Sequence, residues 1–214
     1  TSLVAGNPNS PTGEIVKGMV VLGSERLCQD IEIFKGLVGA NAANTPNDPV
    51  RAGLARMRQL GAQEVGHALG FAHNFAASTQ DRASVMDYPP PRLVIKDGAV
   101  DLSDAYGTGV GAWDMATVDW LYGEPPPGPG AQAAIDAKAA ATAQKLRYGK
   151  DEARRADSAQ AWTALWDDGA DPVAELNRLL GVRRAALDKF GLGNLSAGEP
   201  VANLRRRFVP VYLL

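Results

Sequence analysis

The sequence predicts an α+β fold in which helices dominate. Apolar residues recur at three- and four-residue spacing along most of the chain. Only one segment near the start alternates like a strand, and only one later segment has the form of a hairpin. With 214 residues, of which 45% are hydrophobic, the chain is long enough to bury one sizeable core, with or without a helical appendage.

Two elements are expected in the first 40 residues. The segment TGEIVKGMVVLGS (12–24) alternates as a strand, and its apolar residues fall on both faces, which predicts burial on both sides. A helix is expected over 25–38, because Leu27, Ile31 and Phe34 recur at helical spacing. One convincing strand therefore precedes the longest helix.

That longest helix is expected over about 49–69. Asp48 is a favourable N-cap, and Pro49 occupies the first helical position, where its missing N–H costs nothing. Gly70 is placed to end the helix, since glycine adopts a left-handed conformation freely. The apolar residues on or near one stripe of this helix are Val50, Leu54, Met57, Val65 and Leu69.

The middle of the chain is expected to be mostly irregular, with two exceptions. Asp97 and Gly98 lie between apolar runs and predict a tight hairpin within 92–103. The segment 110–123 has helical spacing. It is followed by EPPPGPG (124–130), a linker that can be neither helix nor central strand.

Three helices are expected after the linker, at about 131–147, 158–167 and 172–190. In the last of these, the residues expected to face inward are Val173, Leu176, Leu180, Leu187 and Phe190.

Composition excludes several classes of function. The net charge is −2, so nothing indicates binding to nucleic acid, and LRRR (204–207) and ARR (153–155) are interpreted as solvated helix faces. No apolar run reaches 18 residues, so no membrane-spanning segment is expected. Because Cys28 is the single cysteine, no intrachain disulfide can form.

The ends of the sequence indicate a piece of a larger parent chain. It opens at Thr1 without a signal-peptide pattern and closes on the apolar stretch FVPVYLL. We therefore expect a processed or excised part of a longer protein.

The stretch AQEVGHALGFAH carries the candidate site. Glu64, His67, Gly70 and His73 have the spacing of the metal motif H-E-x-x-H-x-x-G-x-x-H, in which two histidines lie one helical turn apart. Gln63 stands where the first histidine of that motif would be. Both histidines of the chain fall within this stretch, which favours a metal site over chance.

Helix geometry gives these residue types their roles. Gln63 and His67 are four residues apart and point to the same side, whereas Glu64 is turned by roughly 100° and can reach a metal-bound water without coordinating. A turn at Gly70 would bring His73 back as a further ligand. Zinc in such a site has three protein ligands and one position for water.

A second motif, SVMDY (84–88), begins 11 residues after His73. Together the two motifs resemble the metzincin clan of zinc peptidases, in which a methionine-bearing turn follows the metal-binding helix. In detail the chain is similar to large bacterial zinc-dependent metalloproteases that carry a domain of unknown function. The segments that carry this resemblance are TGEIVKGMVVLGS (12–24), HNFAAS (73–78), MDYPPPR (86–92), DLSDAYGTGVGAWD (101–114) and LWDDGADPV (165–173).

The resemblance implies a role for each site residue. His67 and His73 would be zinc ligands with Gln63 in the third ligand position, and Glu64 would be the general base. Met86 would form the apolar floor under the metal.

Two further implications of the resemblance are weaker. Tyr88 would extend its phenol to the metal or the oxyanion; a hydroxyl bonded to backbone in a buried turn is the structural alternative. The strand around 12–22 would line the substrate cleft, where an extended peptide could add to it.

The resemblance also implies a domain organisation. Residues 1–123 would form a metzincin-like catalytic core with the active-site helix, the Met-turn and a small sheet. Residues 124–130 would be the linker, and residues 131–214 a helical subdomain packed on the core. The implied location is extracytoplasmic.

The implied function is a zinc-dependent endopeptidase that acts on peptides or proteins. Gln63 is expected to weaken the zinc site and attenuate the enzyme, because a neutral amide oxygen is a poorer zinc ligand than imidazole. One alternative is an inactive pseudo-peptidase that binds peptides, and another is a structural helical domain without an inherited site. The sequence leaves open whether Gln63 is natural or an introduced, silencing change.

Overall fold

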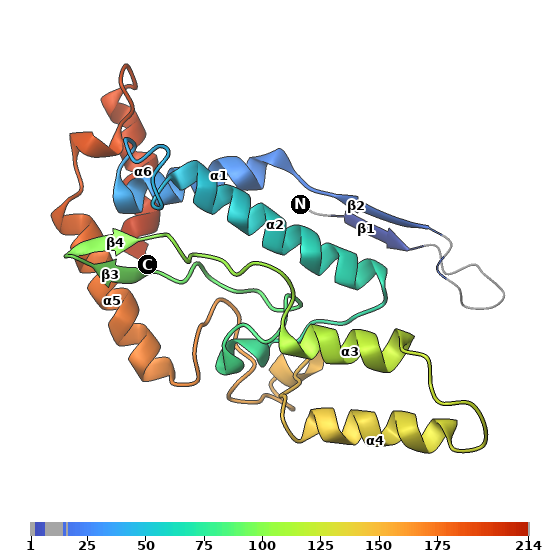
Figure 1. Cartoon of the computed structure of the whole chain (residues 1–214). Helices are drawn as coiled ribbons and strands as arrows, with labels where there is room; N and C mark the ends of the chain where they lie inside the picture. Colours follow the sequence, from blue (N-terminus) through green and yellow to red (C-terminus); the bar gives the residue numbers. More distant parts are fainter. Residues whose placement is uncertain (1–2, 7–14, 16, 214) are drawn as a thin grey trace.

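The structure, a computed structural model shown in Figure 1, describes residues 3–6, 15 and 17–213. It confirms a helix-dominated α+β fold. The strands are β1 (Leu3–Gly6), β2 (Gly18–Val21), β3 (Val94–Lys96) and β4 (Ala99–Asp101). The helices are α1 (Ser24–Val38), α2 (Pro49–Ala68), α3 (Ala112–Tyr122), α4 (Ala131–Ala143), α5 (Pro172–Asp188) and α6 (Leu204–Leu213). Short 3-10 turns are η1 (Ala77–Gln80), η2 (Asp151–Arg154), η3 (Leu192–Asn194) and η4 (Val201–Asn203).

The strands form two separate antiparallel ribbons. β1 pairs with β2, and β3 pairs with β4 across the predicted hairpin. Asp97 and Gly98 have φ angles of 51° and 69°. They are therefore the two left-handed residues that a tight hairpin turn requires. The hairpin prediction is therefore confirmed.

The predicted strand at 12–24 is confirmed only over 18–21, where β2 lies; residues 12–14 and 16 lie outside the described part of the chain. The expectation of burial on both sides is wrong, because Met19 and Val21 are each 46% exposed. The β1–β2 ribbon packs mainly against α2, and these two β2 side chains remain exposed. A preceding strand, β1, was not predicted.

Helix α2 begins and ends as predicted from its capping residues. The Asp48 carboxylate accepts a hydrogen bond from the Val50 N–H at 2.8 Å. At the other end Gly70 has a φ of 91°, and the Phe71 N–H donates to the Gly66 carbonyl at 3.0 Å. This is the hydrogen bond of a Schellman motif, which turns the chain sharply out of the helix.

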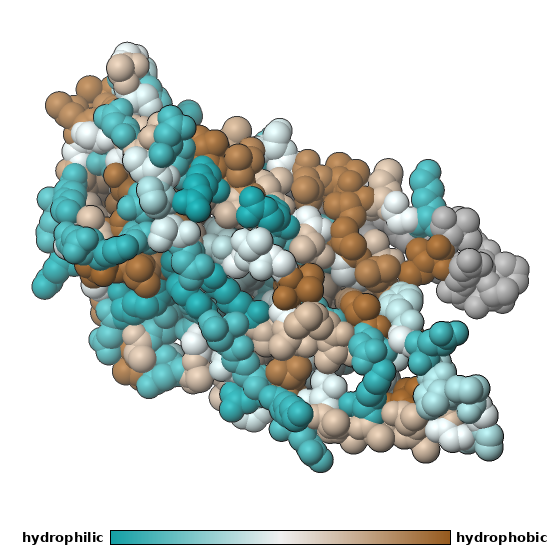
Figure 2. Space-filling model, viewed as in Figure 1, coloured by the Kyte–Doolittle hydropathy of each residue, from teal (hydrophilic) through white to brown (hydrophobic). Residues whose placement is uncertain are grey.

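The buried face of α2 is not its apolar stripe. The stripe residues Val50, Leu54, Val65 and Leu69 are between 36% and 50% exposed. The buried residues, which are small or polar apart from Pro49, are Pro49, Ala52, Gly53, Arg56, Gln59, Gln63, Glu64 and Gly66. Small residues allow α1 to lie close, since a Cβ on Gly53 would lie 3.0 Å from Ile31. Figure 2 shows the exposed apolar surface over α2 and the ribbon. The site residues thus lie on the inner face.

The main core joins the two ends of the chain. It comprises Phe34, Leu37, Ala52, Leu93, Val100, Leu102, Ala105, Tyr106, Val182, Ala186 and Val211. Helices α5 and α6 pack on α1, and α5 also packs on the β3–β4 hairpin, whereas α4 packs on α3 (Figure 1). The segment after residue 131 therefore completes the core. Within the described residues, no helix is long and apolar enough to cross a membrane.

The predicted helix at 158–167 is wrong. This segment forms turns, and Trp166 has a left-handed φ of 60°. Its backbone N–H donates to the Tyr88 carbonyl at 3.1 Å. The long-range contact with Tyr88 replaces the hydrogen bonds that a helix would have made.

In α5 the predicted inward face is also partly wrong. Val173, Leu176 and Leu180 are 65%, 55% and 40% exposed, whereas Val182 and Ala186 are buried. The reason is that the core contacts α5 through its second half.

Helix α6 was not predicted, and Arg207 within it is fully buried. Its guanidinium is ion-paired with Glu32 at 2.9 Å and with Glu199 at 2.8 Å, and its hydrogen bonds lower the pKa of Glu199 to about 2. The interpretation of 204–207 as a solvated face is therefore wrong for Arg207. This buried pairing ties α6 to α1.

Candidate metal centre

The two histidines of the chain come together at the end of α2. His67 lies in the last turn of the helix, and the turn at Gly70 returns the chain so that His73 faces it. The two Nε2 atoms are 3.1 Å apart, and the rings meet nearly at right angles.

The other nitrogen of each ring is held by an oxygen. His67 Nδ1 lies 2.8 Å from the Phe71 carbonyl, and His73 Nδ1 lies 2.9 Å from a carboxylate oxygen of Asp151. An Nδ1 that faces an oxygen donates its proton to it, and in a neutral ring the lone pair then lies on Nε2. Two Nε2 atoms that face each other at this distance need a proton or a metal cation between them. A single zinc ion with bonds of ~2.0–2.1 Å can hold two nitrogens at this separation.

Gln63 has a buried side-chain oxygen on the α2 face that carries His67. It lies one helical turn before His67, on the same side of α2. Its side chain is 1% exposed, and its Oε1 has no hydrogen-bond partner among the described residues. An unsatisfied buried oxygen costs roughly 1–3 kcal/mol, which a cation could offset. Two imidazoles and this amide oxygen thus fit a divalent metal.

The candidate centre has fewer histidine and acidic ligands than a usual metal site. Among the described residues, no three His, Cys, Asp or Glu side chains gather as a metal-binding group. The candidate centre has only two such ligands, because its third position is the amide of Gln63.

Glu64 and Tyr88 line a cavity of about 210 Å³. Glu64 is 8% exposed, and the Tyr88 ring lies edge-on to His73 with centroids 4.8 Å apart. Burial, followed by the negative charges of Asp151 and Glu64, raises the pKa of Tyr88, so its phenol stays protonated and can donate. The structural alternative requires a hydrogen bond from the Tyr88 hydroxyl to the backbone. No such bond is present within the described part of the chain.

Met86 lies beneath the C-terminal end of α2. It is fully buried, with Phe71, Ala77, Ala83 and Trp113 in one cluster. Its carbonyl accepts a hydrogen bond at 2.9 Å from the N–H of Asn74, the residue after His73. The turn that carries Met86 is therefore tied directly to the second histidine.

The first turn of α3 and Gly111 directly before it hold this turn in place. The buried Asp114 carboxylate accepts hydrogen bonds from the Ser84 hydroxyl at 2.5 Å, the Val85 N–H at 2.8 Å and the Gly111 N–H at 2.7 Å. Gly111 approaches so closely that a Cβ there would lie 2.0 Å from the Ala83 carbonyl oxygen. The segment DLSDAYGTGVGAWD thus has a structural role.

Asp151 was not predicted as a site residue. It lies in η2, 78 residues after His73, and no local pattern connects the two. Burial acts to raise the pKa of Asp151, but the hydrogen bond and charge of His73 outweigh it and lower the pKa. A carboxylate that orients a ligating histidine is common around metals.

A family model described as Met-zincin matches residues 45–214. The chain belongs to the Met-zincin family. The match runs from just before α2 to the end of the chain and includes both motifs. No curated protein and no solved structure matches the chain. Membership confirms the resemblance and implies a zinc-binding protein of metallopeptidase type.

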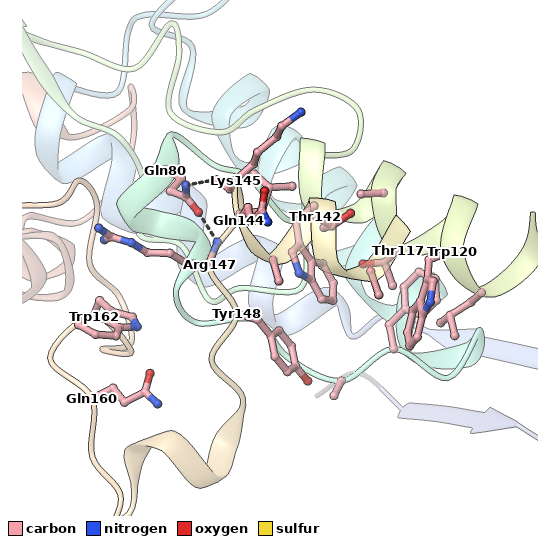
Figure 3. Close-up of a pocket in the computed structure, with 18 of the residues that line it drawn as sticks. Gln80, Thr117, Trp120, Thr142, Gln144, Lys145, Arg147, Tyr148, Gln160 and Trp162 are labelled. Carbon is pink, nitrogen blue, oxygen red and sulfur yellow. Dashed lines mark hydrogen bonds between the residues drawn. The ribbon is translucent and has the colours of Figure 1, made fainter. Parts of the chain in front are cut away.

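The Met-zincin chain also has a larger cavity, of about 1060 Å³. Residues 70–72, directly before His73, form part of its wall. Figure 3 shows Trp120, Tyr148 and Trp162 along it, and Gln80 bonded to the backbone of the segment that carries Tyr148. The walls are mainly apolar. The cavity has room for side chains of a bound peptide.

Two glycines of α2 give opposite expectations for stability. A Cβ on Gly66 would lie 2.3 Å from the sulfur of the fully buried Met86, so Gly66→Ala should destabilise the fold by about 1–3 kcal/mol. On Gly61 the nearest atom is 3.7 Å away, so Gly61→Ala should stabilise the fold by about 0.5–1 kcal/mol. Urea unfolding of both variants measures the difference. Equal effects would contradict the close packing of Met86 under α2.

Proposed function

We propose that this Met-zincin is a zinc-dependent endopeptidase with a weakened metal site. His67, His73 and Gln63 would hold the zinc, and Glu64 would be the general base. The observation that carries the proposal is the pair of Nε2 atoms 3.1 Å apart, each with its Nδ1 engaged elsewhere. The buried, unpartnered Oε1 of Gln63 supports the same site.

Zinc, when bound, would lower the pKa of a water molecule towards neutrality and polarise the substrate carbonyl. The Glu64 carboxylate would accept the proton of the attacking water and pass it to the leaving nitrogen of the peptide bond. The Tyr88 phenol, which its raised pKa keeps protonated, would donate a hydrogen bond to the developing oxyanion. Both side chains line one cavity, so they can reach a common substrate.

Gln63 sets the expected strength of the site. An amide oxygen is neutral and less basic than an imidazole nitrogen, so zinc should bind more weakly than in a three-histidine site. A weaker site would be only partly loaded at low zinc, and hydrolysis would fall in proportion. Zinc titration of the chain, with His67→Ala and His73→Ala as variants that should lose binding, tests this proposal. Unchanged zinc binding in both variants would contradict it.

The second candidate function is a pseudo-peptidase that binds peptides without cutting them. This function is favoured by Gln63, which stands in place of the first histidine of the motif. A chain that lacks this ligand could lose its metal and with it the hydrolytic activity. The two functions differ in whether the chain with its zinc restored hydrolyses a protein substrate.

Asp151 gives a further test of the site. Asp151→Asn removes the negative acceptor at His73 Nδ1 and should lower zinc affinity by about 10- to 100-fold. Competition with a zinc chelator measures the change, and Asp157→Asn, at an exposed position six residues further on, is the matched control. Equal affinities for the two variants would show that Asp151 does not orient His73.

A further inference from the structure

The cavity beside Glu64 is lined by two arginines from different helices. Arg26 comes from the first turns of α1, and Arg56 comes from α2, eight residues before Glu64. Leu60 and Trp166 supply apolar wall. We call the part of this cavity formed by Arg26, Arg56, Leu60 and Trp166 the arginine pocket.

Arg56 is buried with part of its hydrogen-bonding capacity unused. It is 3% exposed, its Nη1 donates to Gln59 Oε1, and its Nε has no hydrogen-bond partner among the described residues. Asp30, a buried acid on α1, is ion-paired with Arg26 at 3.3 Å. Burial lowers the pKa of Arg56, which means that nearby acids do not compensate for its lost hydration.

Both guanidinium groups lie near the ring of Trp166. The Arg26 and Arg56 carbons lie 5.9 and 5.8 Å from its ring centroid, within the range of cation–π contacts. Arg56 also lies 5.6 Å from the Tyr106 ring. Aromatic faces thus position the guanidinium of Arg56 without accepting hydrogen bonds from it, and a planar anion is the ligand whose geometry matches such a group.

We propose that the arginine pocket binds the carboxylate of an acidic residue, glutamate or aspartate, in a substrate peptide close to the bond that is cut. This rests on the proposed function, because Glu64 lines the same cavity. Arg26, Arg56 and Glu64 line the cavity, and Arg26 is already paired with Asp30, so the guanidinium of Arg56 is the group that would attract an anion. At about 210 Å³ the cavity is smaller than typical ligand pockets of ~300–1,000 Å³ and suits a single side chain. Leu60 and Trp166 would cover its methylene stem.

The test compares binding of N-acetyl-glutamate amide and N-acetyl-glutamine amide to the 214-residue chain by NMR titration. A charge-assisted hydrogen bond should give the glutamate ligand an advantage of about 10-fold at low salt. Arg56→Gln should reduce this preference to less than about 2-fold. Arg26→Gln, at a partly exposed position, should also reduce it and is the second variant if Arg56→Gln does not fold.

Arg58→Gln is the matched control, because Arg58 is exposed on the same helix and outside the pocket. Equal binding of the two ligands, no binding of either, or an equal loss of preference in Arg58→Gln would overturn the proposal. The titration needs neither zinc nor hydrolysis, so its result is distinguishable from a failure of the peptidase proposal. Conversely, casein cleavage that persists without any preference for acidic ligands would overturn the pocket alone.

Discussion

Replacing Gln63 with histidine is expected to raise zinc affinity by more than the ~10–100-fold that a change around the ligands typically produces. The substitution acts on a ligand itself: it exchanges an amide oxygen for an imidazole nitrogen on the same side of α2 as His67. Casein cleavage should rise with zinc loading. Elemental analysis, chelator competition and a casein assay measure the three quantities for the chain and for Gln63→His.

Gln29→His is the control, since Gln29 is exposed on α1 and adds an imidazole away from the site. Cleavage by both the chain and Gln63→His supports an enzyme that tolerates glutamine. Cleavage by Gln63→His alone identifies a silenced peptidase and favours the binding role for the chain itself. An absence of both zinc and cleavage in Gln63→His would contradict the site.

Glu64→Gln is expected to lower hydrolysis by about 10²- to 10⁴-fold in the Gln63→His background, because a glutamine cannot accept the proton of water. Zinc content should not change, since Glu64 is not proposed as a ligand. The measurements are zinc stoichiometry and the cleavage rate on the same preparation.

The control for this second substitution is Glu25→Gln, an exposed acid in the first turn of α1. Hydrolysis that survives Glu64→Gln within a few-fold would remove Glu64 from the mechanism. A parallel loss of zinc would instead assign it to the metal. Either result would require a different general base.

Local chemistry explains what the sequence predicted well. Asp48 and Pro49 begin α2, and Gly70 ends it, because capping and left-handed turns depend on neighbouring residues only. The hairpin at Asp97 and Gly98 follows for the same reason. The approach of the His67 and His73 rings depends on the turn at Gly70, so the spacing of these three residues was enough to predict that approach.

Tertiary packing explains what could not be predicted. The apolar stripe of α2 indicated its buried face wrongly, because close approach to α1 needs small residues such as Gly53. The segment around Trp166 is not helical, and the Trp166 N–H instead donates to the carbonyl of Tyr88, which is far away in the sequence. Asp151 likewise reaches His73 across 78 residues, and no periodicity encodes such a contact.

X-ray absorption at the zinc edge of the metal-loaded chain tests the central claim most directly, because it counts imidazole ligands. We expect one zinc per chain with two imidazoles and oxygen atoms as its remaining neighbours. A folded chain that takes up no zinc, or a zinc ion with fewer than two imidazoles, would contradict the metal centre described here.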